Sequence, residues 1–97
     1  MKYYFVAQIR IDDEVKYQEY LYKAGHVFLR FNGKYLAVDN APQVLEGSWD
    51  YSRAVIIQFN SKKDFEEWYY SDEYQKILKH RFEASHCDTI LIQGDEL

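Results

Sequence analysis

Apolar and polar residues alternate with a period of two in two segments of the chain, which predicts two β-strands. The segments are Tyr3–Ile11 and Arg53–Phe59. The alternation predicts one sheet face that carries Phe5, Ala7, Ile9, Val55, Ile57 and Phe59. The opposite face then carries Tyr4, Val6, Gln8, Arg10, Ala54, Ile56 and Gln58.

The segment after the first strand has apolar residues at helical spacing. Asp12 or Asp13 offers an N-cap, and Asn32-Gly33 ends the pattern. The apolar positions are Tyr17, Tyr20, Leu21, Ala24, Phe28 and Phe31. We therefore predict a helix that runs from this cap to Asn32.

A second helical segment follows the strand that ends at Phe59. Ser61 with Asp64 resembles a capping box, and Ser71-Asp72 repeats the cap signal within the segment. The apolar stripe consists of Phe65, Trp68, Tyr69, Tyr74, Ile77, Leu78 and Phe82. We expect a helix that breaks or bends at Ser71-Asp72 and packs its aromatic residues on the sheet.

Two further strands are predicted at Lys34–Val38 and Thr89–Gln93. Pro42 ends pairing after the first of these, although Val44-Leu45 is a candidate for a short extension. The resulting order is strand, helix, strand, strand, helix, strand, with no linker or repeat. We therefore predict one α+β domain over residues 1–97, with the ferredoxin-like βαββαβ arrangement and both helices on one face of a four-stranded antiparallel sheet.

The sheet face without helices is predicted to be half apolar and half polar. It carries Tyr4, Val6, Gln8 and Arg10, then Ile56 and Gln58, then Thr89, Leu91 and Gln93. A monomer would forgo ~1.5–3 kcal/mol for each of its apolar side chains that could be buried. We therefore expect a homodimer in which two sheets pack face to face as a dimeric α/β barrel. The alternative is a monomer with one sheet face in water.

Composition and charge exclude several classes of partner. Hydrophobic residues at 47% indicate a globular chain, while the net charge of −4 disfavours nucleic acid as a partner. No apolar run is long enough to span a membrane, and Gln8 and Arg10 interrupt the first apolar stretch too early for a signal peptide. Cys87 is the single cysteine, which suits a reducing compartment. We expect a cytoplasmic protein.

The histidines and the cysteine do not form a recognisable metal or haem motif. His80, His86 and Cys87 lack the ligand spacings that close around zinc, and His26 lies on the other helix. In an extended strand His86 would point away from Cys87, which disfavours a paired nucleophile. Glycine-rich phosphate loops are also absent from the sequence. We therefore expect no metal and no cofactor.

Several motifs spread along the chain resemble one uncharacterised family. They are Val44-Leu45-Glu46-Gly47 with Trp49, the strand Arg53–Phe59 leading into Ser61, Trp68-Tyr69 with Ser71, Glu73-Tyr74-Gln75, Arg81 and Asp88. Together they resemble the domain-of-unknown-function family number 1330, in the dimeric α/β-barrel superfamily. The resemblance implies the dimeric barrel as well. Members elsewhere in that superfamily include cofactor-free monooxygenases, an isomerase and haem enzymes, while the family itself has no agreed reaction.

The candidate site is predicted at one end of the barrel interior. Gln8, Arg10, Gln58 and Gln93 would face this interior, and Glu46, Trp49 and Arg53 would flank the loop that caps it. Tyr35 and Trp49 could stack a planar ligand, Arg10 or Arg53 could hold a carboxylate or enolate, and Glu46 is a weak candidate for proton transfer. Alternatively, Glu46 and Arg53 form an ion pair within one subunit or between subunits, Trp49 only packs, and the glutamines bond to one another.

Two classes of function follow from this site. The first is a small-molecule-binding protein that acts as a cofactor-independent oxygenase-like or isomerase-like enzyme on a planar anionic compound. The second is a non-catalytic ligand-binding or stress-related structural module that uses the same cavity. The sequence leaves open whether the protein is an enzyme.

Overall fold

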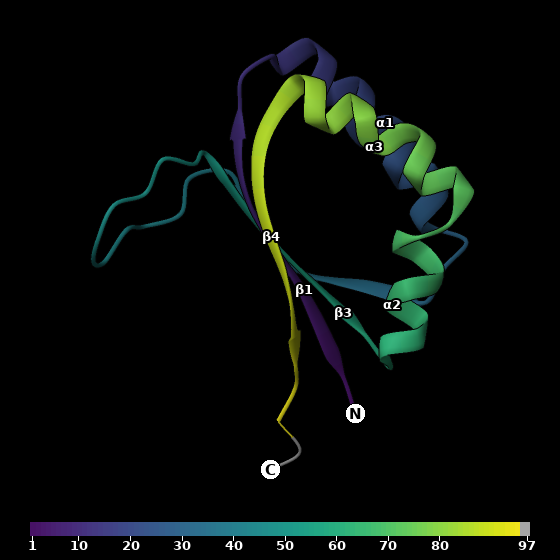
Figure 1. The fold of residues 1–97 in the computed structure, drawn as a ribbon. Coiled ribbons are helices and arrows are strands. Elements are labelled where there is room, and N and C mark those ends of the chain that lie inside the picture. The colour runs from purple at the N-terminus through teal and green to yellow at the C-terminus, as the bar shows by residue number, and fades with distance from the viewer. Residues whose placement is uncertain (96–97) are drawn as a thin grey trace.

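The computed structural model describes residues 1–95 and contains a four-stranded antiparallel sheet with three helices (Figure 1). The elements are β1 (Tyr3–Ile11), α1 (Glu14–Phe28), β2 (Gly33–Asp39), β3 (Arg53–Phe59), α2 (Lys62–Tyr69), α3 (Asp72–Ala84) and β4 (Ser85–Gln93). The sheet order is β2-β3-β1-β4, with all neighbours antiparallel. The predicted ferredoxin-like fold is confirmed, with the second helix divided in two.

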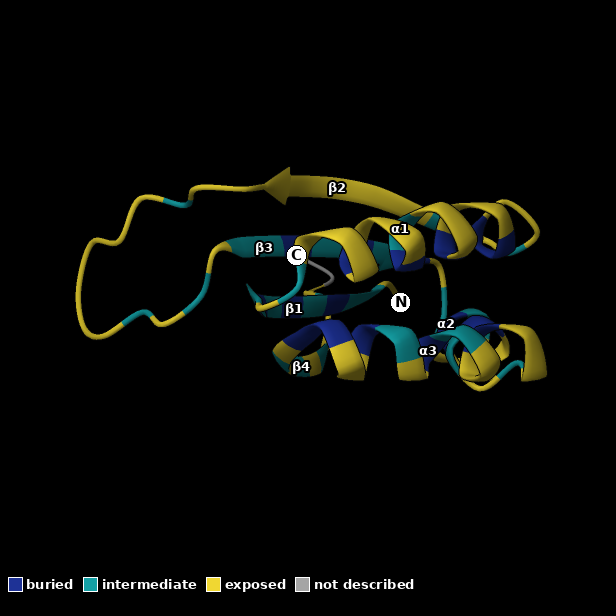
Figure 2. Ribbon diagram, turned by 90° about the horizontal axis from the view of Figure 1, so that it is seen from above, coloured by how far each residue is buried: buried dark blue, intermediate teal, exposed yellow. Residues whose placement is uncertain are grey.

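The helices all lie on one face of the sheet, as Figure 1 shows. The core forms between the two layers, where β1 and β3 bury the predicted side chains, among them Phe5, Ile9 and Phe59. From above, the buried sides of the helices face the central strands, whereas β2 is exposed along most of its length (Figure 2). None of the elements described within residues 1–95 covers the opposite face, which we call the open face.

Helix α1 begins where predicted but ends earlier. Asp13 caps it by accepting a hydrogen bond from the Lys16 amide at 3.1 Å, and its last helical residue is Phe28. The helix ends before Gly33, because Gly33 is already the first residue of β2. There it lies directly beside the rings of Phe28 and Phe59. A Cβ atom on Gly33 would lie 2.6 Å from the Phe28 ring and 2.8 Å from the Phe59 ring. Gly33 therefore permits close aromatic packing at the start of β2.

The predicted break in the second helical segment is confirmed. Ser61 accepts a hydrogen bond from the Asp64 amide at 3.0 Å and so begins α2. Ser71 accepts one from the Tyr74 amide at 3.1 Å and donates one to the Trp68 carbonyl at 2.8 Å. One serine thus links the end of α2 to the start of α3, which brings Trp68 and Tyr74 into contact with a ring separation of 4.4 Å.

Two strand predictions are wrong. Val44-Leu45 forms no strand, because residues 40–52 leave the sheet as a long arm on the side away from the helices (Figure 1). β4 begins at Ser85, four residues before the predicted Thr89. Its first residues look too polar for a strand, yet they pair with the end of β1. His86 and Asp88 are exposed there, so their polarity costs nothing.

The prediction for the faces of β4 is also wrong. Thr89 lies opposite Ala7 and Leu91 opposite Phe5, so both share the helix-covered side. Cross-strand partners point to the same face of a sheet, and the alternation then reverses the predicted assignment. The open face of β4 carries His86, Asp88, Ile90 and Ile92.

Candidate functional site

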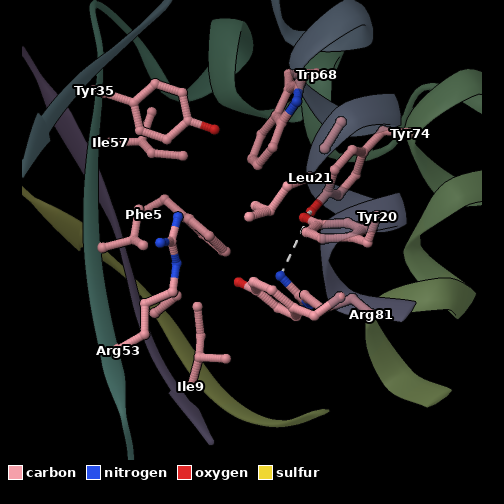
Figure 3. A pocket seen from close by; sticks show the side chains of 14 residues that line it. Phe5, Ile9, Tyr20, Leu21, Tyr35, Arg53, Ile57, Trp68, Tyr74 and Arg81 are labelled. Atoms are coloured by element: carbon pink, nitrogen blue, oxygen red, sulfur yellow. Dashed lines mark hydrogen bonds between the residues drawn. The ribbon is translucent and has the colours of Figure 1, made fainter. Parts of the chain in front are cut away.

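Aromatic side chains and two arginines line a cavity between the sheet and the helices (Figure 3). The polar members are Tyr17 and Tyr20 of α1, Tyr35 of β2, Arg53 of β3, Trp68 of α2, and Tyr74 and Arg81 of α3. The free space is about 440 Å³ including its mouth, and the centre of a water-sized sphere can reach about 30 Å³ of it. That smaller volume holds only a few water molecules, so a larger ligand requires side chains at the mouth to move.

Arg81 is the most deeply buried charged side chain of this cavity. It is only 3% exposed, and its Nη1 lies 3.5 Å from the hydroxyl of Tyr74. Its Nε has no acceptor, and none of the residues that line the cavity is an aspartate or glutamate. Burial lowers the pKa of Arg81, but the nearby hydroxyls of Tyr74 and Tyr20 outweigh it and leave the pKa raised. The guanidinium therefore stays charged inside the cavity.

Arg53 approaches the cavity from the sheet side. It lies opposite Ile9, on the helix-covered face, and its guanidinium carbon is 5.8 Å from the centre of the Tyr17 ring. Its Nη1 donates to the Asn40 side chain at 2.7 Å, while its Nε is buried without an acceptor. Figure 3 shows the guanidinium groups of Arg53 and Arg81 approaching from opposite walls. The two positive charges thus share one aromatic enclosure.

The tyrosine hydroxyls of the cavity remain neutral at ordinary pH. The hydroxyls of Tyr20 and Tyr74 are 2.7 Å apart, and burial raises the pKa of Tyr74 to about 12 and that of Tyr20 well above its usual value. Burial also raises the pKa of Tyr17 and Tyr35. A neutral phenol can donate a hydrogen bond to an anion, so these groups add to the donors supplied by the arginines.

Donors without acceptors are concentrated at this cavity. Within residues 1–95, four buried side-chain nitrogens have no hydrogen-bond partner, and three of them belong to cavity residues: Arg53, Trp68 and Arg81. Buried polar groups in folded proteins are normally paired. The arrangement is therefore complementary to a molecule that brings acceptors and negative charge, with a planar body that can lie against aromatic rings.

The structure divides the predicted site residues among four places. Gln8, Arg10 and Gln58 lie on the open face, as predicted. Tyr35 and Arg53 lie on the other side of the sheet and line the cavity, so their predicted position at the barrel end is wrong. Glu46 and Trp49 lie on the arm. Gln93 lies opposite Tyr3, away from the open face, and its amide contacts the sulfur of Met1.

The predicted site residues therefore do not form one site. Trp49 contacts Tyr51 with a ring separation of 5.2 Å and does not join Tyr35. Within the described chain Arg53 donates to Asn40 and forms no ion pair with Glu46, while an ion pair between subunits stays a prediction. The alternation that puts Val55 and Ile57 on the helix-covered face extends to Arg53, so this signal could have placed Arg53 on the cavity side.

Polar groups at the base of the arm pair with one another. Arg10 contacts Asp12 at 3.0 Å and Asp50 at 2.8 Å, so its charge is compensated by two carboxylates. Asp88 accepts a short hydrogen bond from the hydroxyl of Tyr51 and lies 3.4 Å from His86. These contacts fix the base of the arm on the open face. They leave no uncompensated positive charge at the cluster for an anionic ligand.

Sequence reasoning missed the buried position of Arg81 in the cavity. Tyr74, Leu78 and Arg81 recur at positions i, i+4 and i+7 of α3, and all three are buried. An arginine in an otherwise apolar helical stripe is the signal that could have identified Arg81, because charged residues are rarely buried without a partner. Tyr17 and Tyr20 were predicted as core residues only.

Neither a metal centre nor a membrane helix is evident in the described residues. Within residues 1–95, His, Cys, Asp and Glu side chains nowhere gather in groups of three that could hold a metal ion. None of the helices in that range is long and apolar enough to cross a membrane.

The element order and sheet topology define a ferredoxin-like α+β domain. The family model for the domain of unknown function DUF1330 matches residues 2–95, and the chain belongs to this family. The predicted family resemblance is thereby confirmed. A comparison with curated protein sequences finds no match.

Solved structures share this fold over nearly the whole chain. A protein of unknown function from Rhodopseudomonas palustris is similar at a TM-score of 0.81 and 20% identity, covering 99% of this chain and 84% of that chain. SnoaB, a cofactor-independent oxygenase from Streptomyces nogalater, gives a TM-score of 0.70 at 12% identity, covering 99% and 95%. A dimeric ferredoxin-like protein of unknown function from Thermobifida fusca gives 0.68 at 12% identity, covering 95% and 90%. At these identities the likeness shows the fold alone.

Proposed function

We propose that the protein binds a small planar anion in the cavity between the sheet and the helices. The observation that carries this proposal is Arg81, a charged guanidinium that is 3% exposed and faces no carboxylate among the residues that line the cavity. Burying an uncompensated charge costs several kcal/mol. An anionic ligand would offset this cost, and the aromatic walls would favour a flat molecule.

The lining favours the binding of a preformed anion over the abstraction of a proton. The cavity contains neither a carboxylate nor a histidine, and burial raises the pKa of its tyrosines, so it offers no base for neutral pH. An isomerase reaction would need such a base, and Glu46 lies exposed on the arm. A cofactor-independent oxygenase acting on an enolate-like anion would not require one. This chemistry is the finer proposal, and the likeness in fold to SnoaB is compatible with it.

Non-catalytic binding is the alternative use of the same cavity. The donors that hold an anion in place are also sufficient for a protein that only carries or senses it. Turnover would distinguish the two: oxygen consumption with a bound enolic compound supports the oxygenase, and saturable binding without consumption supports the carrier. Both require the anion site at Arg81.

We further propose that two copies of the chain pair through their open faces. Tyr4, Val6 and Ile56 are only half-buried there, and Ile90 and Ile92 are 60% and 46% exposed. Solved neighbours of this fold from Thermobifida fusca and Bacteroides fragilis are described as dimeric. Pairing would bury this apolar centre without closing the mouth of the cavity from the helix side.

The anion site can be tested by tryptophan fluorescence. The chain has two tryptophans, so Trp49→Phe leaves Trp68, in the cavity wall, as the reporter. Crotonate, a planar monoanion with a short skeleton, should change this fluorescence saturably. Arg81→Gln should weaken its binding at least about tenfold, as expected for loss of a charge-assisted hydrogen bond.

The control is Arg30→Gln, which removes an exposed arginine that is paired with Glu73 outside the cavity. It changes the net charge by the same amount and should leave crotonate binding intact. Crotonate binding that survives Arg81→Gln, or that is lost equally with Arg30→Gln, would contradict the proposed site.

A further inference from the structure

Arg53 lies where the inner cavity meets a second hollow. The outer hollow, of about 290 Å³, is lined by the N-terminal part of α1 and the two ends of the arm, including Glu14, Asn40 and Ser52. Tyr17, Leu21 and Arg53 line both spaces. Arg53 is therefore positioned at the mouth, whereas Arg81 lies at the inner end of the cavity.

The carboxylate of the outer hollow does not neutralise Arg53. Glu14 accepts a hydrogen bond from the Gln18 side chain at 3.0 Å, and Arg53 donates its Nη1 to the neutral amide of Asn40. Its Nε is buried without an acceptor. Both arginines also lower the pKa of Tyr17, although burial outweighs them and raises it overall, which places both charges within electrostatic reach of one hydroxyl.

We propose that the natural ligand of this cavity carries two acidic groups on a short planar skeleton, one held by Arg81 and the other by Arg53. This inference rests on the proposed anion site and deepens it. A monoanion would compensate Arg81 and leave Arg53, which is half-buried, without a negative partner. A dianion compensates both, while Tyr17 can donate a hydrogen bond between them.

The skeleton is short because the enclosed space is small. Only about 30 Å³ of the cavity is open to the centre of a water-sized sphere, so the inner part accepts a small group and the mouth must accommodate the rest. Asn40 holds one side of the Arg53 guanidinium and leaves the Nε side for a carboxylate. Small unsaturated dicarboxylates and enolic acids of similar size fit this pattern.

Crotonate and fumarate form a matched pair of probes for the second charge. Both have four carbons in a flat trans skeleton, and fumarate replaces the methyl group of crotonate with a carboxylate that is ionised at pH 7. Titration of the Trp49→Phe protein by Trp68 fluorescence, confirmed by calorimetry, should show fumarate binding at least about tenfold more tightly than crotonate.

Arg53→Gln should remove this preference. Fumarate affinity should fall to that of crotonate, and crotonate affinity should change less than about twofold, because the monoanion uses Arg81. Arg81→Gln should weaken both probes, and Arg30→Gln should weaken neither. Circular dichroism of each variant establishes that the fold is retained.

Different outcomes overturn the two proposals separately. Equal affinities of the wild-type protein for crotonate and fumarate, or an equal loss of both with Arg53→Gln, would overturn the two-charge ligand and leave the anion site in place. Binding that is insensitive to Arg81→Gln, or no binding of either probe to the wild-type protein, would overturn the anion site and this inference with it.

Discussion

The two sides of the sheet place arginine side chains in opposite environments. On the open face Arg10 is 42% exposed and contacts two carboxylates, at 3.0 and 2.8 Å. On the helix-covered side Arg81 is 3% exposed, and the cavity around it contains only aromatic, aliphatic and arginine side chains. The chain therefore compensates a charge where water already screens it, and leaves a charge uncompensated where screening is weakest.

The apolar residues show the reverse contrast. The helix-covered side buries most aliphatic and aromatic groups of β1 and β3, as with Phe59 at 0% exposed, whereas the open face leaves Ile90 at 60%. The two sides therefore lack different things. The cavity lacks a negative charge next to its arginines, and the open face lacks a partner that covers its apolar side chains. The proposed small anion and the proposed second copy of the chain would therefore occupy opposite sides of one sheet.

Two adjacent isoleucines of β3 provide the strongest test of this contrast. Ile57 faces the core and is 3% exposed, while Ile56 faces the open side and is half-buried. Ile57→Asp should prevent stable folding, because an unpaired carboxylate in the core costs more than about 3 kcal/mol. Ile56→Asp should leave each chain folded but dissociate the proposed dimer. Circular dichroism and light scattering measure the two effects.

The matched control for this pair is Ile56→Val, which keeps the open face apolar. It should remain dimeric and folded. A protein in which Ile56→Asp stays dimeric would mean that the subunits associate through another surface. Monomeric mass for the wild-type chain across the micromolar range would remove the proposed pairing altogether.

Arg81→Met should separate stability from binding. Methionine keeps the length and much of the volume of the side chain without its charge, so we expect the free energy of unfolding to rise by about 1–4 kcal/mol. The same substitution should abolish binding of crotonate. Urea denaturation and fluorescence titration measure the two quantities on one protein.

The opposite result would redefine the cavity. If Arg81→Met lowered stability by a similar amount, the guanidinium would be compensated in the unliganded protein, and the argument from an uncompensated charge would fail. Arg10→Met is the comparison on the open face. Because its pairs are exposed and screened, Arg10→Met should change the free energy of unfolding far less than Arg81→Met does.

Two glycines should have smaller and opposite effects on stability. Gly33→Ala should destabilise the protein by about 1–3 kcal/mol, because the new methyl group would force the Phe28 and Phe59 rings to move. Gly25 lies inside α1 with open space around it. Gly25→Ala should therefore stabilise the protein by about 0.5–1 kcal/mol. Thermal denaturation of both variants measures the difference, and equal shifts would contradict the close packing at Gly33.

Local sequence signals predicted most of the fold. Alternation in β1 and β3 defined their faces correctly, because each strand has a long uninterrupted run of apolar residues on the covered side. The serines at positions 61 and 71 marked both helix starts, since a hydroxyl cap acts within one turn of the chain. Both signals depend only on residues that are close together in the sequence.

The candidate site could not be predicted in the same way, because it depends on register and on contacts between distant elements. The faces of β4 follow from its pairing with β1, where Leu91 lies opposite Phe5, and both strand faces contain apolar residues. The cavity brings together Arg53 and Arg81 from different layers. Arg53 and Arg81 are far apart in the sequence. Reasoning from proximity along the chain therefore grouped Arg53 with Trp49 and did not identify Arg81.

The last and smallest prediction concerns the paired polar groups of the open face. The hydrogen bond from Tyr51 holds the pKa of Asp88 below its ordinary value, and the charge of His86 acts in the same direction. A depressed carboxyl pKa stabilises the folded state above the pKa of the unfolded chain, and this contribution is lost as pH falls through the lower folded value. Tyr51→Phe should therefore raise the pKa of Asp88 towards its ordinary value, and NMR titration of the carboxyl carbon measures this shift. Tyr17→Phe, on the cavity side, removes a hydroxyl without touching this cluster and should leave Asp88 unchanged. A pKa of Asp88 that does not respond to Tyr51→Phe would show that the arm is not fastened to the open face by this bond.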